Sequence, residues 1–381
     1  MSSPQIVTLG CRLNHAESAR IVALLQGQDV TVVNTCAVTA AAMRDSRKAV
    51  RRAGMGGRRV IATGCAATID PAGFAKLAEV MPNAAKPDWV AHDRRSLPDK
   101  RAAVHTRAFV PVQNGCDHSC TFCIIPQGRG PSWSRPVADV IAEIAELAEQ
   151  GVAEVVLTGV DLTSYDAPSL GALVAAILRS VPALTRLRLS SLDGIEIDPL
   201  LFELLTQEPR VMPHVHLSLQ SGDDMVLKRM KRRHSRAQAI ALVERLKTAR
   251  PGIAIGADLI AGFPTETAEM HAANRSIIAA CDVVHGHIFP YSPRPGTPAA
   301  RMPQVEHSLI RARAAELRAD VGDRRDRWLA GHFGTRHAVL AERDGTGHAP
   351  DFARFAVPVG TVPGAIIELT ATTFADGLLT A

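Results

Sequence analysis

Short apolar runs alternate with helical patterns over the first hundred residues. The runs IVTLG at 6–10, VTVVNTC at 30–36 and RVIATGC at 59–65 have the length and the β-branched content of buried strands. This alternation predicts a small parallel α/β domain at 1–100. A charged, proline-bearing stretch at 82–101 is typical of a linker out of this domain.

A second, larger alternation follows at 101–328. Six candidate strands lie at 108–113, 154–159, 184–191, 214–220, 253–262 and 283–291, with helical patterns between them. Six βα units predict a partial (βα)6 barrel, whose functional loops follow the C-terminal ends of the strands. A proline-rich crossing at 290–303 and a charged helix around 311–327 lead to short strands with glycine turns. We expect the segment 329–381 to form a small β-barrel.

The composition agrees with a globular protein of two or three domains. The chain has 381 residues, of which 46% are hydrophobic and 21% charged. It has no stretch near the roughly 18 consecutive apolar residues that a membrane span needs, and no leader pattern, so we expect a cytoplasmic protein without a membrane partner. The seven irregularly spaced cysteines argue against a disulfide framework and for metal ligation or catalysis.

Three cysteines share the loop CDHSCTFC, directly after the first predicted barrel strand. Cys116, Cys120 and Cys123 can ligate three irons of a 4Fe-4S cluster and leave the fourth iron open. In radical S-adenosylmethionine (SAM) chemistry, SAM occupies that open iron, and electron transfer cleaves it into methionine and a 5'-deoxyadenosyl radical. A structural zinc ion is the alternative. Zinc takes four protein ligands, and His118 lies inside the loop, where ligation would strain it.

Polar residues and glycines follow the other predicted strands at the same rim. Glycine lets the backbone approach a ligand, and polar groups can hold the amino group and ribose hydroxyls of SAM. Taken singly, each of these residues is equally an ordinary turn residue. The predicted SAM contacts are Gly159, Asp161, Ser190, Ser191, Gln220, Gly262 and Glu266.

A second set of cysteines ends the three strands predicted in the first domain. The carboxyl ends of parallel strands face one crevice, so Cys11, Cys36 and Cys65 are expected to converge there. Buried cysteines that act as small apolar residues are the alternative. Cys281 fits no motif and is assigned to the core.

Beyond the cysteines, the sequence resembles the radical SAM methylthiotransferases over nearly its whole length. The resemblance rests on TLGCRLNHAES, VVNTCAVT and ATGCAA, and on CDHSCTFCIIPQGRG, HLSLQSGDDMVLKRMKRRH, GADLIAGFPTET and HIFPYSPRPGTPAARM. It implies that Cys11, Cys36 and Cys65 bind a second 4Fe-4S cluster. One SAM would then methylate a sulfur held there, and a second SAM would give the radical that removes hydrogen from adenine C2. An electron donor of the flavodoxin or ferredoxin type is also implied, whereas the sulfur donor stays open.

Three branches of this family differ in substrate. One modifies N6-isopentenyladenosine in tRNA, one an aspartate of a ribosomal protein, and one N6-threonylcarbamoyladenosine at position 37 of tRNA. The segments CRLNHAES and FPYSPRPGTPAA, and the IIP and RG after the cluster cysteines, are most similar to the third branch. The other branches remain alternatives, as does a non-catalytic metal-bound RNA-binding protein. The segment 329–381 resembles a truncated, mildly acidic TRAM domain.

Basic residues predict where the anticodon loop of tRNA binds. A helix at about 41–52 would place five cations on one face without interleaved acids, and a second basic cluster lies at 228–236. A solvated helix face is the alternative. Aromatic residues make up only 4% of the chain, so base stacking is limited to Trp133, Tyr165 and Tyr291. The predicted RNA contacts are Arg44, Arg47, Lys48, Arg51, Arg52, Arg232 and Arg233.

Overall fold

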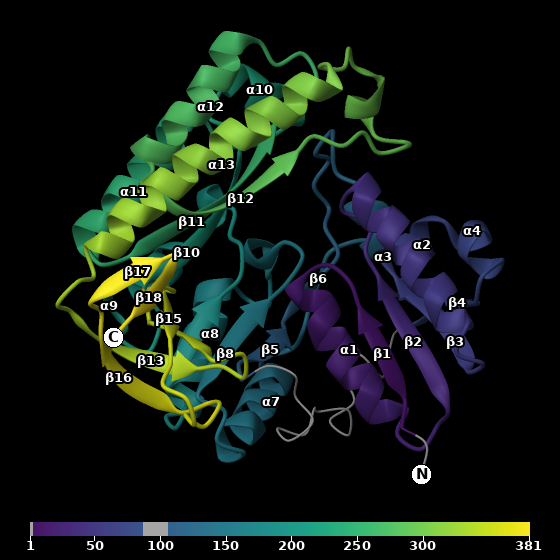
Figure 1. The fold of residues 1–381 in the computed structure, drawn as a ribbon, viewed down its shortest axis with the longest axis horizontal. Coiled ribbons are helices and arrows are strands. Elements are labelled where there is room, and N and C mark those ends of the chain that lie inside the picture. The colour runs from purple at the N-terminus through teal and green to yellow at the C-terminus, as the bar shows by residue number, and fades with distance from the viewer. Residues whose placement is uncertain (1–2, 87–105) are drawn as a thin grey trace.

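The computed structural model describes residues 3–86 and 106–381, which fold into three units (Figure 1). The N-terminal unit, drawn in purple, lies beside a central unit in teal and green, and the C-terminal unit, in yellow, lies on the other side. The two chain ends are therefore on opposite sides of the molecule. No helix in the two described ranges is long and apolar enough to cross a membrane.

The N-terminal unit is a parallel sheet with the strand order β1-β2-β3-β4, which confirms the small parallel α/β fold. Its strands are β1 (Gln5–Thr8), β2 (Val30–Thr35), β3 (Arg59–Gly64) and β4 (Glu79–Met81). The helices are α1 (Arg12–Leu24), α2 (Ala40–Gly54), α3 (Cys65–Ile69) and α4 (Pro71–Ala75). All six residues of β2 are buried, as expected of a strand with both faces covered.

The sequence pattern did not predict β4, because three residues are too short to show a period. The start of the predicted linker is part of this unit as well. A 3-10 turn, η1 (Asn83–Ala85), leads to Lys86, which is buried against Glu17 of α1. The rest of the predicted linker, 87–101, lies outside the described residues.

The central unit is a curved parallel sheet of six main strands, which confirms the partial barrel. One half contains β5 (Ala108–Pro111), β8 (Glu154–Thr158) and β9 (Arg186–Leu189), and the other β10 (His214–Gln220), β11 (Ala254–Ala261) and β12 (Val283–Pro290). Parallel bridges from Leu187 to Val211 and from Leu192 to Leu217 join the halves. A short hairpin of β6 (Gln113–Asn114) and β7 (Trp133–Ser134) frames the cysteine loop.

Helices cover the outside of this sheet. They are α7 (Val137–Glu149), α8 (Leu170–Ser180), α9 (Pro199–Gln207), α10 (Asp224–Met230), α11 (Arg236–Ala249) and α12 (Ala268–Ala280), with the long α13 (His307–Ala330) packed on β12 and α12 (Figure 1). The short α6 (Ile125–Arg129) instead packs on α3 and η1 of the N-terminal unit. The main apolar core lies between these helices and the outward face of the strands, for example at Leu157, Leu187 and Leu217. Because side chains alternate along a strand, the inward face carries the other residues, including Glu154, Arg188 and His216.

The C-terminal unit is a six-stranded sheet with the order β16-β13-β14-β15-β18-β17. The runs HAVLAE, RFAVPV and AIIELTA, which have the pattern of short strands, form β13 (Arg336–Ala341), β15 (Arg354–Ala356) and β16 (Ile366–Thr370). The strands β14 (Thr346–His348), β17 (Thr373–Ala375) and β18 (Leu378–Thr380) are additional. Leu329 at the end of α13 packs into its core with Phe355 and Leu379. The strand-rich C-terminal region is thus confirmed, with β16 and β17 at its edges.

Candidate metal centre

The loop of Cys116, Cys120 and Cys123 is held by its backbone, so its three sulfurs are left for ligation. The amide of Cys116 donates to Gly130 O at 3.1 Å, and the amide of Thr121 donates to Met230 O at 3.1 Å. Burial, with smaller contributions from the neighbouring Asp161, Cys123 and Cys120, raises the pKa of Cys116 to about 12, although the hydrogen bond from the His118 amide lowers it. Thiols in such surroundings become thiolates when a metal supplies the compensating positive charge.

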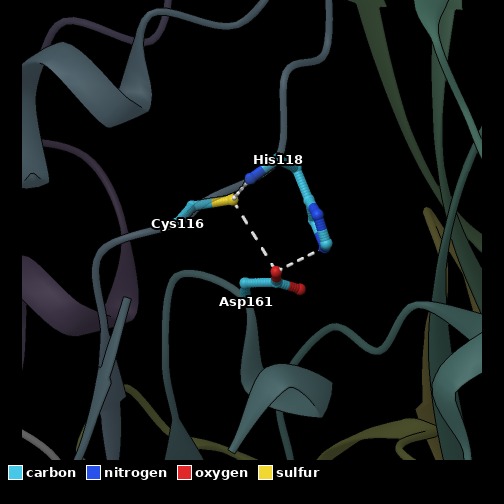
Figure 2. Close-up of side chains that lie close together, drawn as sticks. All are labelled: Cys116, His118 and Asp161. Atoms are coloured by element: carbon cyan, nitrogen blue, oxygen red, sulfur yellow. Dashed lines mark hydrogen bonds and ion pairs between the residues drawn. The ribbon is translucent and has the colours of Figure 1, made fainter. Parts of the chain in front are cut away.

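Asp161 lies against this loop, as the sequence predicted for the rim (Figure 2). Its Oδ2 is 2.7 Å from His118 Nε2 and 3.7 Å from Cys116 Sγ, while its backbone amide donates to Gln113 Oε1 at 2.8 Å. Among the described residues, Cys116, His118 and Asp161 lie close enough together to share a metal ion. No such set combines His118 with Cys120 or Cys123. This grouping gives no support to a zinc ion bound by His118 together with all three cysteines.

Arg232 was predicted to contact RNA, but the structure turns it toward the cysteine loop. Its Nη1 is 3.7 Å from Cys120 Sγ, its Nη2 donates to Asp193 at 2.8 Å, and its side chain is only 8% exposed. Arg233 also faces the loop, where it contacts Glu196 at 2.8 Å and His118 Nε2 at 2.9 Å. The RNA prediction for Arg232 is corrected, because its guanidinium is already occupied inside the protein.

The second triad converges as the strand ends predicted. Cys11 caps α1, Cys36 follows β2, and Cys65 begins α3. Burial, with smaller contributions from the nearby Cys11 and Cys65 thiols, raises the pKa of Cys36 to about 11. Gly10 has a φ of +96°, and a Cβ there would lie 2.7 Å from Cys36 Sγ. Glycine is therefore required for the chain to pass this sulfur.

Arg129 connects the segment after the first triad to Cys65 of the second triad, across the seam between the units. It ends α6, just after the first triad, yet its Nε donates to Cys65 Sγ at 3.2 Å in the N-terminal unit. Its two Nη atoms donate to Glu17 and Asn14 of α1, and its side chain is 2% exposed. Cys65 also raises the pKa of Cys123, so one cysteine of each triad lies within electrostatic reach of the other.

The remaining predicted SAM contacts are divided between the rim and the packing around it. Ser190 is buried, and its Oγ has no hydrogen-bond partner among residues 3–86 and 106–381. Ser191 is half-buried beside it. Gln220 ends β10 with a φ of +65°, a strained conformation of the kind found at functional sites. Gly159 packs so closely on Gln113 that a Cβ would lie 2.9 Å from its Oε1.

Gly262 and Glu266 connect the loop after β11 to helix α13. Glu266 accepts from Gly262 N at 3.1 Å and from Arg313 at 2.9 Å, although burial raises its pKa to about 7. A Cβ on Gly262 would lie 2.6 Å from the Ile310 side chain. Helix packing therefore explains this glycine, and the ligand approach assumed from the sequence is not needed for it.

The basic face of α2 is less uniform than the sequence analysis assumed. Asp45 lies on the same helix and is 3.8 Å from Lys48, so the expectation of a face without acids was wrong. Arg47 is paired with Asp70 at 2.6 Å. On α2, the exposed cations that make no ion pair with any described residue are Arg44, Arg51 and Arg52.

Two of the three aromatic candidates for base stacking are buried. Tyr165 is 3% exposed and donates to Arg135 O at 2.7 Å, and Tyr291 is 6% exposed and packs edge-on against Phe263. Only Trp133, at 36%, presents its ring to solvent. The prediction that the two tyrosines stack on bases is therefore not supported by their positions.

Several residues of this centre carried no recognisable sequence signal. Arg129, Glu17, Lys86 and Asp193 make the closest charged contacts around the triads, but each partner lies far away in the chain. The available hints were the positions of Arg129 in the GRG that follows the first triad and of Glu17 in the segment TLGCRLNHAES.

Comparisons with known proteins agree with this geometry. Residues 110–275 match the Radical SAM superfamily, and residues 4–84 match a family described as Uncharacterized protein family UPF0004. Among solved structures, a radical S-adenosylmethionine methyltransferase, TsrM, from Kitasatospora setae with cobalamin and a [4Fe-4S] cluster aligns with a TM-score of 0.54 and 14% identity, over 80% of this chain and 82% of that one. The fold and the site define a radical SAM enzyme.

Curated relatives give the narrower family. Threonylcarbamoyladenosine tRNA methylthiotransferase MtaB of Rickettsia prowazekii is 41% identical over 377 residues, which cover 91% of this chain and 90% of the relative. The tRNA-2-methylthio-N(6)-dimethylallyladenosine synthase of Maricaulis maris is 31% identical, covering 89% of this chain and 86% of its own. The tRNA-2-methylthio-N(6)-dimethylallyladenosine synthase of Cereibacter sphaeroides is 40% identical over a shorter alignment, which covers 65% of this chain and 57% of the relative. This chain belongs to the radical SAM methylthiotransferase family.

Proposed function

We propose that this enzyme joins a methylthio group to C2 of N6-threonylcarbamoyladenosine at position 37 of tRNA, using two SAM molecules and two 4Fe-4S clusters. The observation that carries the proposal is the pair of cysteine triads that face one seam, where Arg129, from the helix after the first triad, donates to Cys65 of the second triad. Two triads, each with room for an open iron, fit two clusters with separate tasks. When bound, the cluster on the 116–123 loop supplies the electron that cleaves SAM, and the other holds the sulfur.

The protein's own residues would position these groups. In this proposal residues 1–100 carry Cys11, Cys36 and Cys65, residues 101–328 carry the SAM site, and 329–381 form the truncated TRAM-like domain. Arg232 lies beside Cys120, and Asp193 holds its guanidinium in that position. The proposed SAM contacts around the 116–123 loop are Gly159, Asp161, Ser190, Ser191 and Gln220.

The exposed face of α2 supports contact with the anticodon loop. Arg44, Arg51 and Arg52 are free to neutralise phosphates, and the helix start is tied to the barrel because Ala40 N donates to Ser292 Oγ at 3.1 Å. An adenine in an anticodon loop is single-stranded and can enter a pocket without opening a duplex. The reaction would take place in the cytoplasm with a flavodoxin-type or ferredoxin-type electron donor.

The choice of substrate branch follows from the relatives. The threonylcarbamoyladenosine enzyme of Rickettsia prowazekii aligns over nearly its full length at 41% identity. The full-length alignment to a dimethylallyladenosine synthase has 31% identity. This difference favours the threonylcarbamoyl substrate over the isopentenyl one.

Anaerobic reconstitution tests the proposal. Cluster-loaded enzyme, SAM and a reductant are incubated with tRNA that carries either modified adenosine, and the digested nucleosides are analysed by mass spectrometry. We expect the methylthio product from threonylcarbamoyladenosine only, and none from a Cys120→Ala control. A product from isopentenyladenosine alone would assign the chain to another branch. Protein that binds tRNA but holds no iron and cleaves no SAM would support the non-catalytic alternative.

A further inference from the structure

Two histidines and an aspartate meet on the inward face of the barrel. His216 Nε2 on β10 is 3.0 Å from Asp258 Oδ1 on β11, and His287 Nδ1 on β12 is 3.1 Å from the same oxygen. The centroids of the two imidazole rings lie 4.5 Å apart, and one ligand atom from each of the three residues lies within 4.8 Å of the others. None of these residues belongs to either cysteine triad, and the proposed reaction assigns them no task.

The register of the three strands fixes this arrangement. Asp258 and His287 are paired residues on the neighbouring parallel strands β11 and β12, and His216 is paired with Gly256 of β11. Side chains alternate along a strand, so Gly256 and Asp258 share the inward face. A Cβ on Gly256 would clash with Nδ1 of His216. Only glycine therefore leaves room for this ring to lie across β11 and reach Asp258.

The three ligand atoms have the spacing that a metal ion imposes. Imidazole nitrogens and carboxylate oxygens bind zinc at about 2.1 Å, and two such atoms at a right angle are about 3.0 Å apart. The two nitrogen-to-oxygen distances here are 3.0 and 3.1 Å. Two imidazoles and a carboxylate are ligands typical of zinc and ferrous iron, whereas magnesium and calcium prefer oxygen ligands alone. The set therefore fits a divalent transition-metal ion.

Charge also favours a cation beside Asp258. Its side chain is 18% exposed, and within residues 3–86 and 106–381 its hydrogen-bond partners are the two histidine rings. With neutral rings the set carries one negative charge, and buried charges in proteins are paired or coordinate metals. Arg188 on the same face is already held by Glu154 at 2.9 and 3.2 Å. Arg12 lies within electrostatic range of Asp258 and opposes a cation, so we expect weaker binding than at a closed site with four ligands.

We propose that His216, Asp258 and His287 bind a divalent transition-metal ion, as a third metal centre besides the two proposed clusters. Three protein ligands leave at least one coordination position open, as in catalytic rather than structural metal sites. The side chain of His287 is 59% exposed, so an ion can enter from this side and water can fill the open position. The inference goes beyond the proposed function and requires no particular RNA substrate, so its test is independent of the proposed reaction.

A hydrogen-bonded set of the same three residues without a metal is the alternative. The distances of 3.0 and 3.1 Å are also those of hydrogen bonds, in which Asp258 accepts from both rings. In that case the removal of one ring would leave the metal content of the protein unchanged. The removal of a metal ligand would lower it, so metal binding distinguishes the two arrangements.

The test measures the binding of Zn²⁺ to the cluster-loaded protein by anaerobic equilibrium dialysis and elemental analysis, in the presence of excess Mg²⁺. The variants are His216→Gln, Asp258→Asn and His287→Gln. The matched control is His307→Gln, which changes an exposed histidine at the start of α13. X-ray absorption at the zinc edge identifies the ligands, because zinc in an incompletely filled cysteine triad would show sulfur neighbours at about 2.3 Å.

We expect wild type and His307→Gln to bind one zinc ion per chain, with nitrogen and oxygen neighbours only. Each of the three ligand variants should weaken zinc binding by about 100-fold or more, because even residues behind the ligands change metal affinity by about 10- to 100-fold. Circular dichroism and iron content show whether each variant folds and keeps its clusters. If a change at the buried His216 or at Asp258 unfolds the protein, the exposed His287→Gln variant decides the comparison.

Three results would overturn the metal site. They are a wild type that takes up no zinc beyond its clusters, equal zinc affinity in wild type and His287→Gln, and zinc bound through sulfur alone. Failure of the proposed function gives a different pattern. If cluster-loaded wild type forms no methylthio product on tRNA but binds zinc in a His287-dependent way, the metal site stands and the assigned reaction falls.

Discussion

Replacing Arg129 by methionine tests whether the buried charges at the seam hold the two triads in place. The change leaves a shorter, unbranched apolar side chain and removes the charge and the hydrogen bonds to Glu17, Asn14 and Cys65. Arg129 and Glu17 are 2% and 4% exposed, so solvent cannot replace the lost partner. Removing one member of a buried ion pair costs about 3–5 kcal/mol.

The expected loss is at the lower end of this range, about 3 kcal/mol, because Glu17 keeps its contact with Lys86 at 3.1 Å. Burial on its own would raise the pKa of Glu17, but Arg129 and Lys86 together lower it to about 2, which reflects the strength of both contacts. The matched control is Arg59→Met. Its pair with Glu79 is 58% and 49% exposed and should contribute less than about 1 kcal/mol.

Urea unfolding of the anaerobic, cluster-loaded proteins, followed by circular dichroism, measures both losses. A double-mutant cycle with Glu17→Gln should give a coupling energy of about 1–3 kcal/mol, because the two residues share one network. The reduction potential of the second cluster should also become more negative, since a hydrogen bond and a positive charge next to Cys65 are lost. A loss no larger than that of Arg59→Met, with no coupling to Glu17, would refute this account of the seam.

The other predictions concern the two triads, the RNA surface and the C-terminal unit. Cys120→Ala should abolish reductive SAM cleavage, whereas Cys65→Ala should spare cleavage and stop sulfur insertion; equal loss of cleavage in both would contradict separate tasks. Arg51→Gln should weaken tRNA binding and reduce the slope of log affinity against log salt by about 0.9, measured by filter binding from low to high salt. Burial alone would lower the pKa of His332, but Asp351, 2.7 Å away, raises it above its usual value. The ion pair of His332 and Asp351 therefore stabilises the folded protein fully below about pH 6.5, and this stabilisation is lost as the pH rises through the raised pKa of His332. The loss of unfolding free energy caused by Asp351→Asn, measured in urea, should accordingly be smaller at pH 9 than at pH 6.

The sequence by itself determined the features that depend on local spacing and period. Short apolar runs rich in β-branched residues predicted the parallel N-terminal sheet and the six main barrel strands, because parallel strands are covered on both faces and so show little alternation of polar residues. The same strand ends predicted that Cys11, Cys36 and Cys65 converge, since the carboxyl ends of parallel strands meet at one edge. The cluster-binding role of the 116–123 loop was predicted from the spacing of its three cysteines, without tertiary information.

Only the tertiary structure decided which charged groups meet. Arg129 reaches Cys65 across 64 residues of chain, and Arg232 reaches Cys120 across 112. No local pattern records such pairs, so Arg232 looked like an RNA contact until packing placed it inside the protein. Gly262 likewise looked like a ligand residue until its closeness to Ile310 explained it. The sequence alone does not distinguish an exposed arginine or glycine from one that is buried between packed elements. The packing of the units determines which residues it contacts.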